Sequence, residues 1–168
     1  MKKLRLRYLG DPILRKKARK LDKVTSSVRE TVEAMWDLME KSKGIGLAAP
    51  QAGLSQRIIV VDTREDGEQY ALINPEIVWA SDVCSSLSEG CLSIPGVEAE
   101  VIRPSHVRVK GSNIQGKEIE IEAKDLLAKV MQHEIDHLNG VLFIDRLEDR
   151  EKEKIQPELD RFEAPVSV

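Results

Sequence analysis

The stretch MQHEIDHLNG (131–140) contains two histidines four positions apart, His133 and His137, with Glu134 directly after the first. Helix-forming residues fill positions 125–138 and an Asn-Gly pair follows, which predicts a helix over this range. Side chains four apart on a helix lie ~5–6 Å apart at Cβ, so both imidazoles could bind one metal ion. Glu134 could reach a water on that ion. A tetrahedral ion would still need a third protein ligand.

Two common sources of a third ligand fit this chain poorly. The metzincin pattern would place a third histidine three positions after Gly140, but that position is Phe143, which cannot bind a metal. A thermolysin-like site needs a carboxylate on a later helix, and the candidates, Glu153 and Glu158, lie in a tail interrupted by prolines. An HExxH pattern also arises by chance, so the two histidines alone could be ordinary core or surface residues.

Cys91 is the remaining soft ligand. It lies in SEGCLSIPG (88–96), next to Gly90, where the backbone must approach another group closely. A small buried hydrophobic residue is the commonest fate of a free cysteine, and for Cys84, which lacks such a setting, that is our prediction. Two cysteines are too few for a secreted disulfide scaffold, which indicates a reducing compartment. A free thiol there could bind a metal or act as a nucleophile.

Composition excludes several classes of protein. The chain has 168 residues, 41% hydrophobic and 33% charged, which fits one globular domain with no apolar run long enough to span a bilayer. The first twenty residues are rich in lysine and arginine, but no apolar segment follows and serine is absent, so we expect neither a secretory signal nor a transit peptide. A net charge of −3 with 4% aromatic residues gives no footprint of direct DNA binding.

The order of predicted elements indicates the fold class. A helix is predicted over 26–42 and an irregular glycine-rich loop over 44–53. Strand patterns follow, and the second helix comes after them; the strands are expected at 57–62, 76–80, 101–111 and 117–123. Because strands and helices do not alternate regularly, we predict an α+β fold with antiparallel sheets. The tail beyond Arg146 is charge-rich and contains Pro157 and Pro165, so we expect at most a short helix there.

Three stretches together resemble the signature motifs of the peptide deformylase family, in the same order: GIGLAAPQ (44–51), EGCLS (89–93) and QHEIDHLNG (132–140). Two more resemble its flanking segments, GDPILR (10–15) and FIDRL (143–147). The resemblance covers about 8–147. It implies antiparallel β-sheets packed around a central metal-binding α-helix, with 1–147 as a single catalytic domain and 148–168 as a charged C-terminal tail.

The resemblance also implies an activity: metal-dependent removal of the N-formyl group from the N-terminal formyl-methionine of newly synthesised polypeptides, releasing formate. Metal-bound water would attack the formyl carbon, with Glu134 as general base and acid. Gln51 and the Leu92 N–H would bind the formyl oxygen, and Arg103 would pair with Glu89. The implied metal ligands are Cys91, His133 and His137. The implied substrate-binding residues are Ile45, Gly46, Leu87 and Glu89.

Cofactor and partners follow from the same resemblance. One divalent ion per chain is implied, with Fe(II) as the cellular metal, although two imidazoles and a thiolate also suit zinc and could accept nickel or cobalt. We expect a bacterial cytoplasmic enzyme that acts on N-formylmethionyl nascent peptides, without membrane association. Transient ribosome contact is possible, but the acidic excess in the tail argues against contact through that segment. Glu98 departs from the family, many of whose members have an arginine near this position.

Two other functions remain open at this point. Cys91 could be a nucleophile with His133 as its base, which would leave His137 and Glu134 without a role. The fold could also be catalytically silent, with a structural metal or as a ribosome-associated binding module. A structural zinc site would need four protein ligands, and the one other histidine, His106, lies in a strand-like segment.

Overall fold

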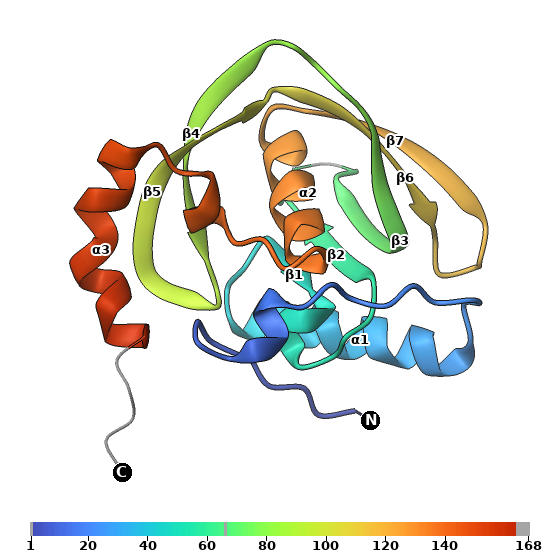
Figure 1. Ribbon diagram of the computed structural model, residues 1–168. Coiled ribbons are helices and arrows are strands. Elements are labelled where there is room, and N and C mark those ends of the chain that lie inside the picture. The colour runs from blue at the N-terminus through green and yellow to red at the C-terminus, as the bar shows by residue number, and fades with distance from the viewer. Residues whose placement is uncertain (1, 66, 164–168) are drawn as a thin grey trace.

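The helix α2 (Asp125–Leu138) lies between two antiparallel sheets (Figure 1). The computed structural model describes residues 2–65 and 67–163. Its helices are α1 (Ser26–Lys41), α2 (Asp125–Leu138) and α3 (Asp149–Glu163), with short 3-10 helices at Pro12–Arg15, Ala49–Ala52 and Phe143–Arg146. Its strands are β1 (Gly46–Ala48), β2 (Ile58–Asp62), β3 (Gln69–Ala80), β4 (Cys84–Cys91), β5 (Ile94–Pro104), β6 (His106–Ser112) and β7 (Glu118–Lys124). The prediction of an α+β fold is confirmed.

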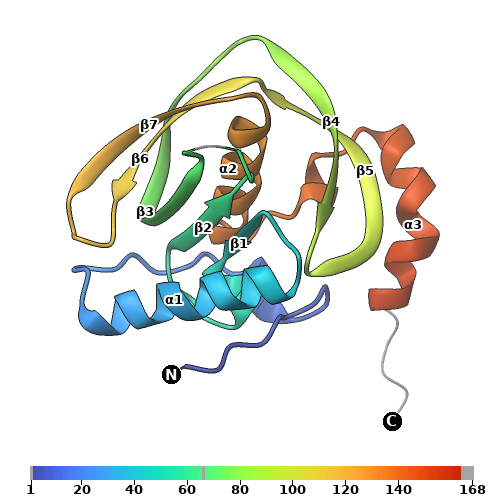
Figure 2. The ribbon, with the colours of Figure 1, turned by 180° about the vertical axis from the view of Figure 1, so that it is seen from behind.

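The two sheets have simple topologies. The larger sheet has the order β1-β2-β3-β6-β7, and β4 and β5 form a separate hairpin, with every strand pairing antiparallel. Seen from behind, α2 again lies between the larger sheet and the hairpin (Figure 2). Among the described residues β1 pairs only with β2, and β4 only with β5, so each of these two strands has an edge without a strand partner.

The helix α2 is buried on nearly every side. Its residues from Leu127 to Leu138 are all buried, and its apolar side chains share a cluster with residues of β2, β6 and β7. One buried residue is a lysine, Lys129, whose amino group donates to the backbone carbonyls of Ser85 on β4 and Arg103 on β5. This side chain therefore links α2 to the hairpin. Its hydrogen bonds offset part of the cost of burying the charged amino group.

Most predicted elements are confirmed, with several corrections. The strand expected at 76–80 is the end of β3, which begins at Gln69, and β4 was not predicted. The helices predicted over 26–42 and 125–138 are α1 and α2. The region 44–53, predicted as a loop, contains the strand β1 and a 3-10 helix. The strand predicted over 101–111 is two strands interrupted at Ser105, because β5 ends at a proline, which cannot donate a backbone hydrogen bond.

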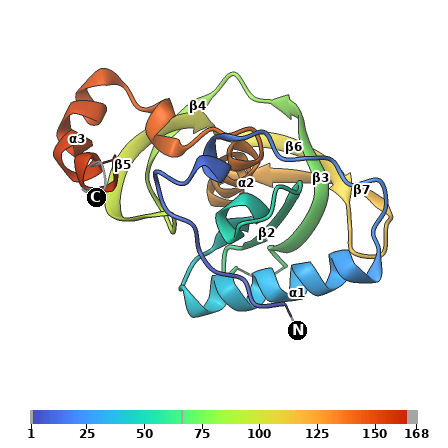
Figure 3. The same ribbon diagram turned by 60° about the horizontal axis from the view of Figure 1, so that its bottom comes forward.

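The prediction of at most a short helix beyond Arg146 is wrong, because α3 has 15 residues and continues through Pro157. The proline removes one helical hydrogen bond, but the buried side chains of Ile155 and Leu159 pack into a cluster with β5. Tertiary packing therefore overrides the local preference. Pro165 lies outside the described residues. Figure 3 shows α3 beside β5, on the far side of the molecule from α1.

None of the helices in the described ranges combines the length and apolar character that crossing a membrane requires.

Candidate metal centre

Three side chains converge between α2 and the hairpin. Cys91 is the last residue of β4, while His133 and His137 lie one turn apart on α2. One potential ligand atom from each lies within 4.8 Å of the others, and Cys91 Sγ is 3.3 Å from His137 Nε2. The two histidines are buried and Cys91 is half-buried. Among the described residues no other group of three such side chains is this close.

The orientation of His133 is set by a neighbouring carboxylate. Its Nδ1 lies 2.9 Å from Glu89 Oε1. Burial alone would raise the pKa of Glu89, but hydrogen bonds from His133 and Arg103 lower it, so this carboxylate stays ionised and can only accept. The ring therefore donates from Nδ1, and Nε2 is the nitrogen that could bind a metal. A carboxylate behind a histidine is the usual arrangement that orients a metal-binding imidazole.

A buried network of charges extends from this carboxylate. Arg103 donates from Nε to Glu89 Oε2 at 2.7 Å and from Nη1 to Asp136 Oδ2 at 2.8 Å. Asp136 also accepts from Arg146, whose side chain is 49% exposed. The family resemblance implied the Glu89–Arg103 pair, whereas the contacts of Asp136 and Arg146 were not predicted. The only available signal was the position of Asp136, one residue before His137.

Gln51 is held in one orientation beside these three side chains. Its Oε1 accepts from the backbone N–H of Ala48 at 2.9 Å, which directs its amide nitrogen toward Cys91 Sγ at 3.4 Å and Ser93 Oγ at 3.2 Å. Leu92 follows Cys91 in the turn between β4 and β5, and its side chain packs against Gly44. Both Gln51 and Leu92 line the cavity described below.

Glu134 faces the same centre without a hydrogen-bond partner for its Oε1, although only 4% of the residue is exposed. Burial raises the pKa of this carboxyl to about 7, despite the opposing charge of His133. Burial and the nearby charges of His133 and Arg103 hold the pKa of His137 well below its usual range, which favours the neutral imidazole that a metal needs. A carboxyl poised near neutral pH can both accept and return a proton.

Glycine at position 46 makes room for this carboxylate. A Cβ at Gly46 would lie 2.6 Å from Glu134 Oε2 and 2.9 Å from Val130 Cγ1, both closer than real contacts allow. The backbone of β1 can therefore pass directly over Glu134 only because residue 46 has no side chain.

Replacing Gly46 by alanine should impair turnover without removing the metal. The added methyl group displaces the Glu134 carboxylate, and a misplacement of ~1 Å can cost about 10²-fold in rate. Metal content should stay at the wild-type level, because the substitution touches none of the three ligands. Steady-state kinetics and elemental analysis on the same preparation check this. Undiminished kcat/KM in Gly46→Ala would show that the contact with Glu134 does not position the carboxylate.

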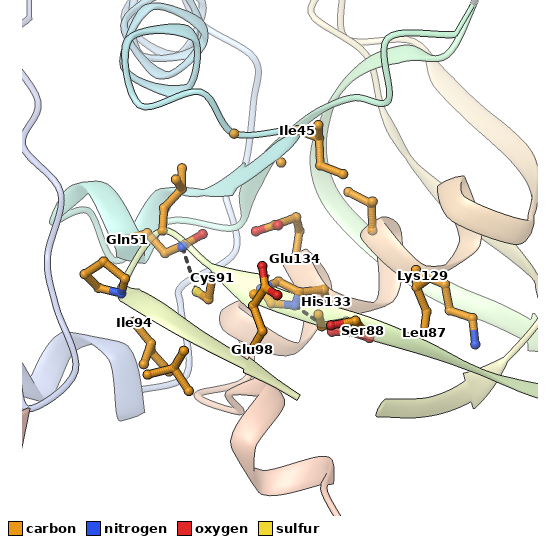
Figure 4. A pocket seen from close by; sticks show the side chains of 18 of the residues that line it. Ile45, Gln51, Leu87, Ser88, Cys91, Ile94, Glu98, Lys129, His133 and Glu134 are labelled. Carbon is orange, nitrogen blue, oxygen red and sulfur yellow. Dashed lines mark hydrogen bonds and ion pairs between the residues drawn. The ribbon is translucent and has the colours of Figure 1, made fainter. Parts of the chain in front are cut away.

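A cavity of about 730 Å³ opens over the centre (Figure 4). Besides Cys91, His133 and Glu134, its walls include every other residue that the resemblance implied for substrate or formyl binding: Ile45, Gly46, Gln51, Leu87, Glu89 and Leu92. His137 lies behind this surface. Leu126 and Val130, which share one helical stripe with His133 and His137 by their spacing, also line the cavity, although they were not predicted to lie there.

The structure also shows where the other residues considered for the metal site lie. Phe143, which stands where a metzincin would have its third histidine, stacks on the His133 ring with 6.0 Å between centroids. Cys84 lies at the opposite end of β4 from Cys91 and is exposed, so the prediction of a buried Cys84 is wrong. The first five residues of this strand, 84–88, are all exposed. His106 begins β6 and packs edge-on against Trp79.

The residues present fit a divalent metal ion. A thiol and two imidazoles form a donor set that first-row transition metals bind, and the carboxylate behind His133 supports it. His137 Nδ1 is buried without a hydrogen-bond partner in the described part of the chain, while Nε2 of the same ring faces Cys91 Sγ. Three protein ligands beside an open cavity are typical of a catalytic metal site, whereas a structural site is closed by four.

Comparisons with known proteins agree with this arrangement. Residues 3–153 match the family described as polypeptide deformylase. The chain is 49% identical over 144 residues to the peptide deformylase of Halothermothrix orenii, covering 86% of this chain and 93% of the relative. It is 50% identical over 151 residues to that of Natranaerobius thermophilus, covering 89% and 96%.

Solved structures give the same result. A plant peptide deformylase, PDF1B, superposes with a TM-score of 0.91 at 42% identity, covering 95% of this chain and 89% of that one. The peptide deformylase of Synechococcus elongatus, solved in complex with actinonin, gives a TM-score of 0.89 at 40% identity, covering 97% and 89%. The matched residues include β4, α2 and therefore the whole candidate metal centre. The chain belongs to the polypeptide deformylase family.

Proposed function

We propose that this chain hydrolyses the formamide bond at the N-terminal formyl-methionine of newly made polypeptides, releasing formate and a free amino group. The observation that carries the proposal is the convergence of Cys91, His133 and His137 beside the unpartnered, buried carboxylate of Glu134. Cys91, His133 and Glu134 line one cavity, with His137 behind them, in a chain of the polypeptide deformylase family.

The proposed roles follow from what each group can do. Cys91, His133 and His137 would hold a divalent ion, which would lower the pKa of a bound water, to about 7 in zinc hydrolases, and so provide a nucleophile at neutral pH. Glu134 accepts a proton as the C–O bond forms at the formyl carbon. It then delivers a proton to the leaving nitrogen as the C–N bond breaks, which balances the addition of one water to the amide.

Two donors would stabilise negative charge on the formyl oxygen. The Gln51 amide nitrogen is held toward the centre by the bond from Ala48 N–H to its own Oε1. The backbone N–H of Leu92, next to Cys91, is the second donor in this proposal. Loss of one such donor costs about 10² to 10³ in rate in other acyl-transfer enzymes.

The cavity walls suit an extended peptide that begins with methionine. The open edges of β1 and β4 both border the cavity, so a peptide could add between them as a strand and hydrogen-bond to each. Four of the apolar side chains that line the cavity would receive the methionine side chain; they are Ile45, Leu87, Leu126 and Val130. A tight wall at Gly46 and Leu92, which both line the cavity, would favour formyl over the larger acetyl group.

The proposal extends to the identity of the metal and to the cellular compartment. Fe(II) is the ion that the family resemblance implies for the cell, and the Cys/His/His set would also accept zinc, nickel or cobalt on isolation. The setting we propose is the bacterial cytoplasm, with formylated nascent chains as substrates and transient contact with the ribosome that presents them. Bacterial curated relatives support this setting.

A pair of matched peptides tests the reaction. Formyl-Met-Ala-Ser should release formate, while acetyl-Met-Ala-Ser should release acetate at least about 10²-fold more slowly, because one extra methyl must fit against Gly46 and Leu92. Formate and acetate can be quantified separately in the same assay. Equal release from both peptides would contradict a site shaped for the formyl group, and release from neither would refute the proposed hydrolysis.

A further inference from the structure

Two carboxylates at the rim of the cavity have no role in the reaction described above. Glu98 lies on β5 and Glu158 on α3, both are exposed, and both line the same cavity as Cys91 and Glu134. Figure 4 shows the Glu98 side chain pointing from its strand into this cavity. Over residues 2–65 and 67–163, no basic side chain forms an ion pair with either carboxylate.

The other charged groups around the cavity have partners or tasks, with one exception. Glu89 is ion-paired with Arg103, and the Lys129 amino group donates to two backbone carbonyls. Glu134 is buried against Gly46 at the reacting centre. The exception is Lys43, a cation on the connection between α1 and β1. The wall formed by β5 and α3 therefore has a net negative charge.

The position of Glu158 depends on the packing of α3. Ile155 and Leu159 are buried in the cluster with β5, and this contact brings the intervening Glu158 to the cavity. The match to the polypeptide deformylase family ends at residue 153, so Glu158 belongs to a part of the chain outside that match. Glu98 lies within that match, so the acidic wall combines one residue from inside the match and one from outside it.

Glu98 is within reach of a bound peptide because of the residue beside it. In the register of the hairpin, Glu98 on β5 lies opposite Gly90 on β4. Gly90 has no side chain to stand between Glu98 and a peptide on the open edge of β4. An extended peptide advances ~3.3 Å per residue and alternates its side chains, so three residues after the methionine cover about 10 Å on both faces.

We propose that Glu98 and Glu158 form a subsite that selects lysine or arginine side chains in the residues following the formylated methionine. This inference rests on the proposed deformylase function and deepens it, because it concerns which nascent chains are processed fastest. The carboxylates act on substrate binding and not on the chemical step, so the preference for basic peptides should appear as a lower KM with an unchanged kcat. Exposed charge pairs are weak and screened by salt, which sets the expected effect at about three- to tenfold in dilute buffer.

Three peptides test the subsite with the metal-loaded enzyme. They are the amides of formyl-Met-Xaa-Xaa-Xaa, with Xaa as lysine, glutamine or glutamate. At low ionic strength kcat/KM should fall in that order, by about three- to tenfold between lysine and glutamate, and the difference should shrink at ~0.5 M salt. In Glu98→Gln/Glu158→Gln the lysine-to-glutamate ratio should fall to within about twofold.

A control variant separates a local subsite from attraction by the whole protein. Glu30→Gln/Glu153→Gln removes the same charge from two exposed positions outside the cavity and should keep the wild-type ratio. An equal ratio in both double variants would overturn the subsite, as would turnover of all three peptides at equal kcat/KM by the wild type. Failure to release formate from any of the three would overturn the proposed function and the subsite with it.

Discussion

Replacing Glu134 by glutamine is expected to lower kcat by about 10³-fold while leaving the metal in place. Glutamine has nearly the shape of glutamate, so it fits the space that Gly46 leaves, but it cannot accept the proton that the reaction must move. The three proposed ligands, Cys91, His133 and His137, keep their side chains. Elemental analysis and formate release, measured on the same sample, check both halves of the expectation.

A conservative variant sharpens this test. Glu134→Asp keeps a carboxylate and should recover part of the activity lost in Glu134→Gln, because proton transfer remains possible from a less favourable distance. Wild-type turnover in Glu134→Gln would refute the assignment of Glu134 as base and acid. Loss of metal from that variant would instead make Glu134 a contributor to metal binding.

Replacing Cys91 by alanine is expected to remove both metal and activity. Two imidazoles one turn apart on α2 would be the only remaining protein ligands, which is too few to hold a divalent ion through purification. Metal content should fall below about a tenth of the wild-type value, and formate release by more than about 10³-fold, because both the nucleophile and its positioning depend on the ion.

Cys84→Ala is the matched control, because Cys84 lies at the other end of the same strand and is exposed. It should retain both metal and turnover. The pattern that contradicts our account is a Cys91→Ala enzyme that is inactive but fully loaded with metal. That result would favour the alternative in which Cys91 is the nucleophile and His133 its base.

The elements with strong hydrophobic periodicity were predictable from the sequence, and those that depend on packing were not. The pattern of α1 and α2 gave their boundaries to within a residue. β4 was missed because its sequence, CSSLSEGC, is small and polar, as suits a strand with one edge on a cavity. α3 was underestimated because burial of Ile155 and Leu159 against β5 outweighs the local cost of Pro157.

The candidate site was predictable where its residues are close in sequence or belong to a motif. Helical spacing alone placed His133 and His137 on one face of α2, but spacing could not select Cys91. Cys91 remained as a candidate after other sources of a third ligand were set aside, and the resemblance then implied it as a ligand. The structure brings its Sγ to 3.3 Å from His137 Nε2. Arg146 was not predictable, because its bond to Asp136 depends on how the chain turns after α2.

The most direct test of the central claim is formate release from formyl-Met-Ala-Ser by enzyme purified without oxygen, before and after metal removal. Our account predicts close to one divalent ion per chain, hydrolysis that disappears when a chelator removes the ion, and recovery when Fe(II) is returned. Hydrolysis that continues at the original rate after complete removal of the metal would contradict it.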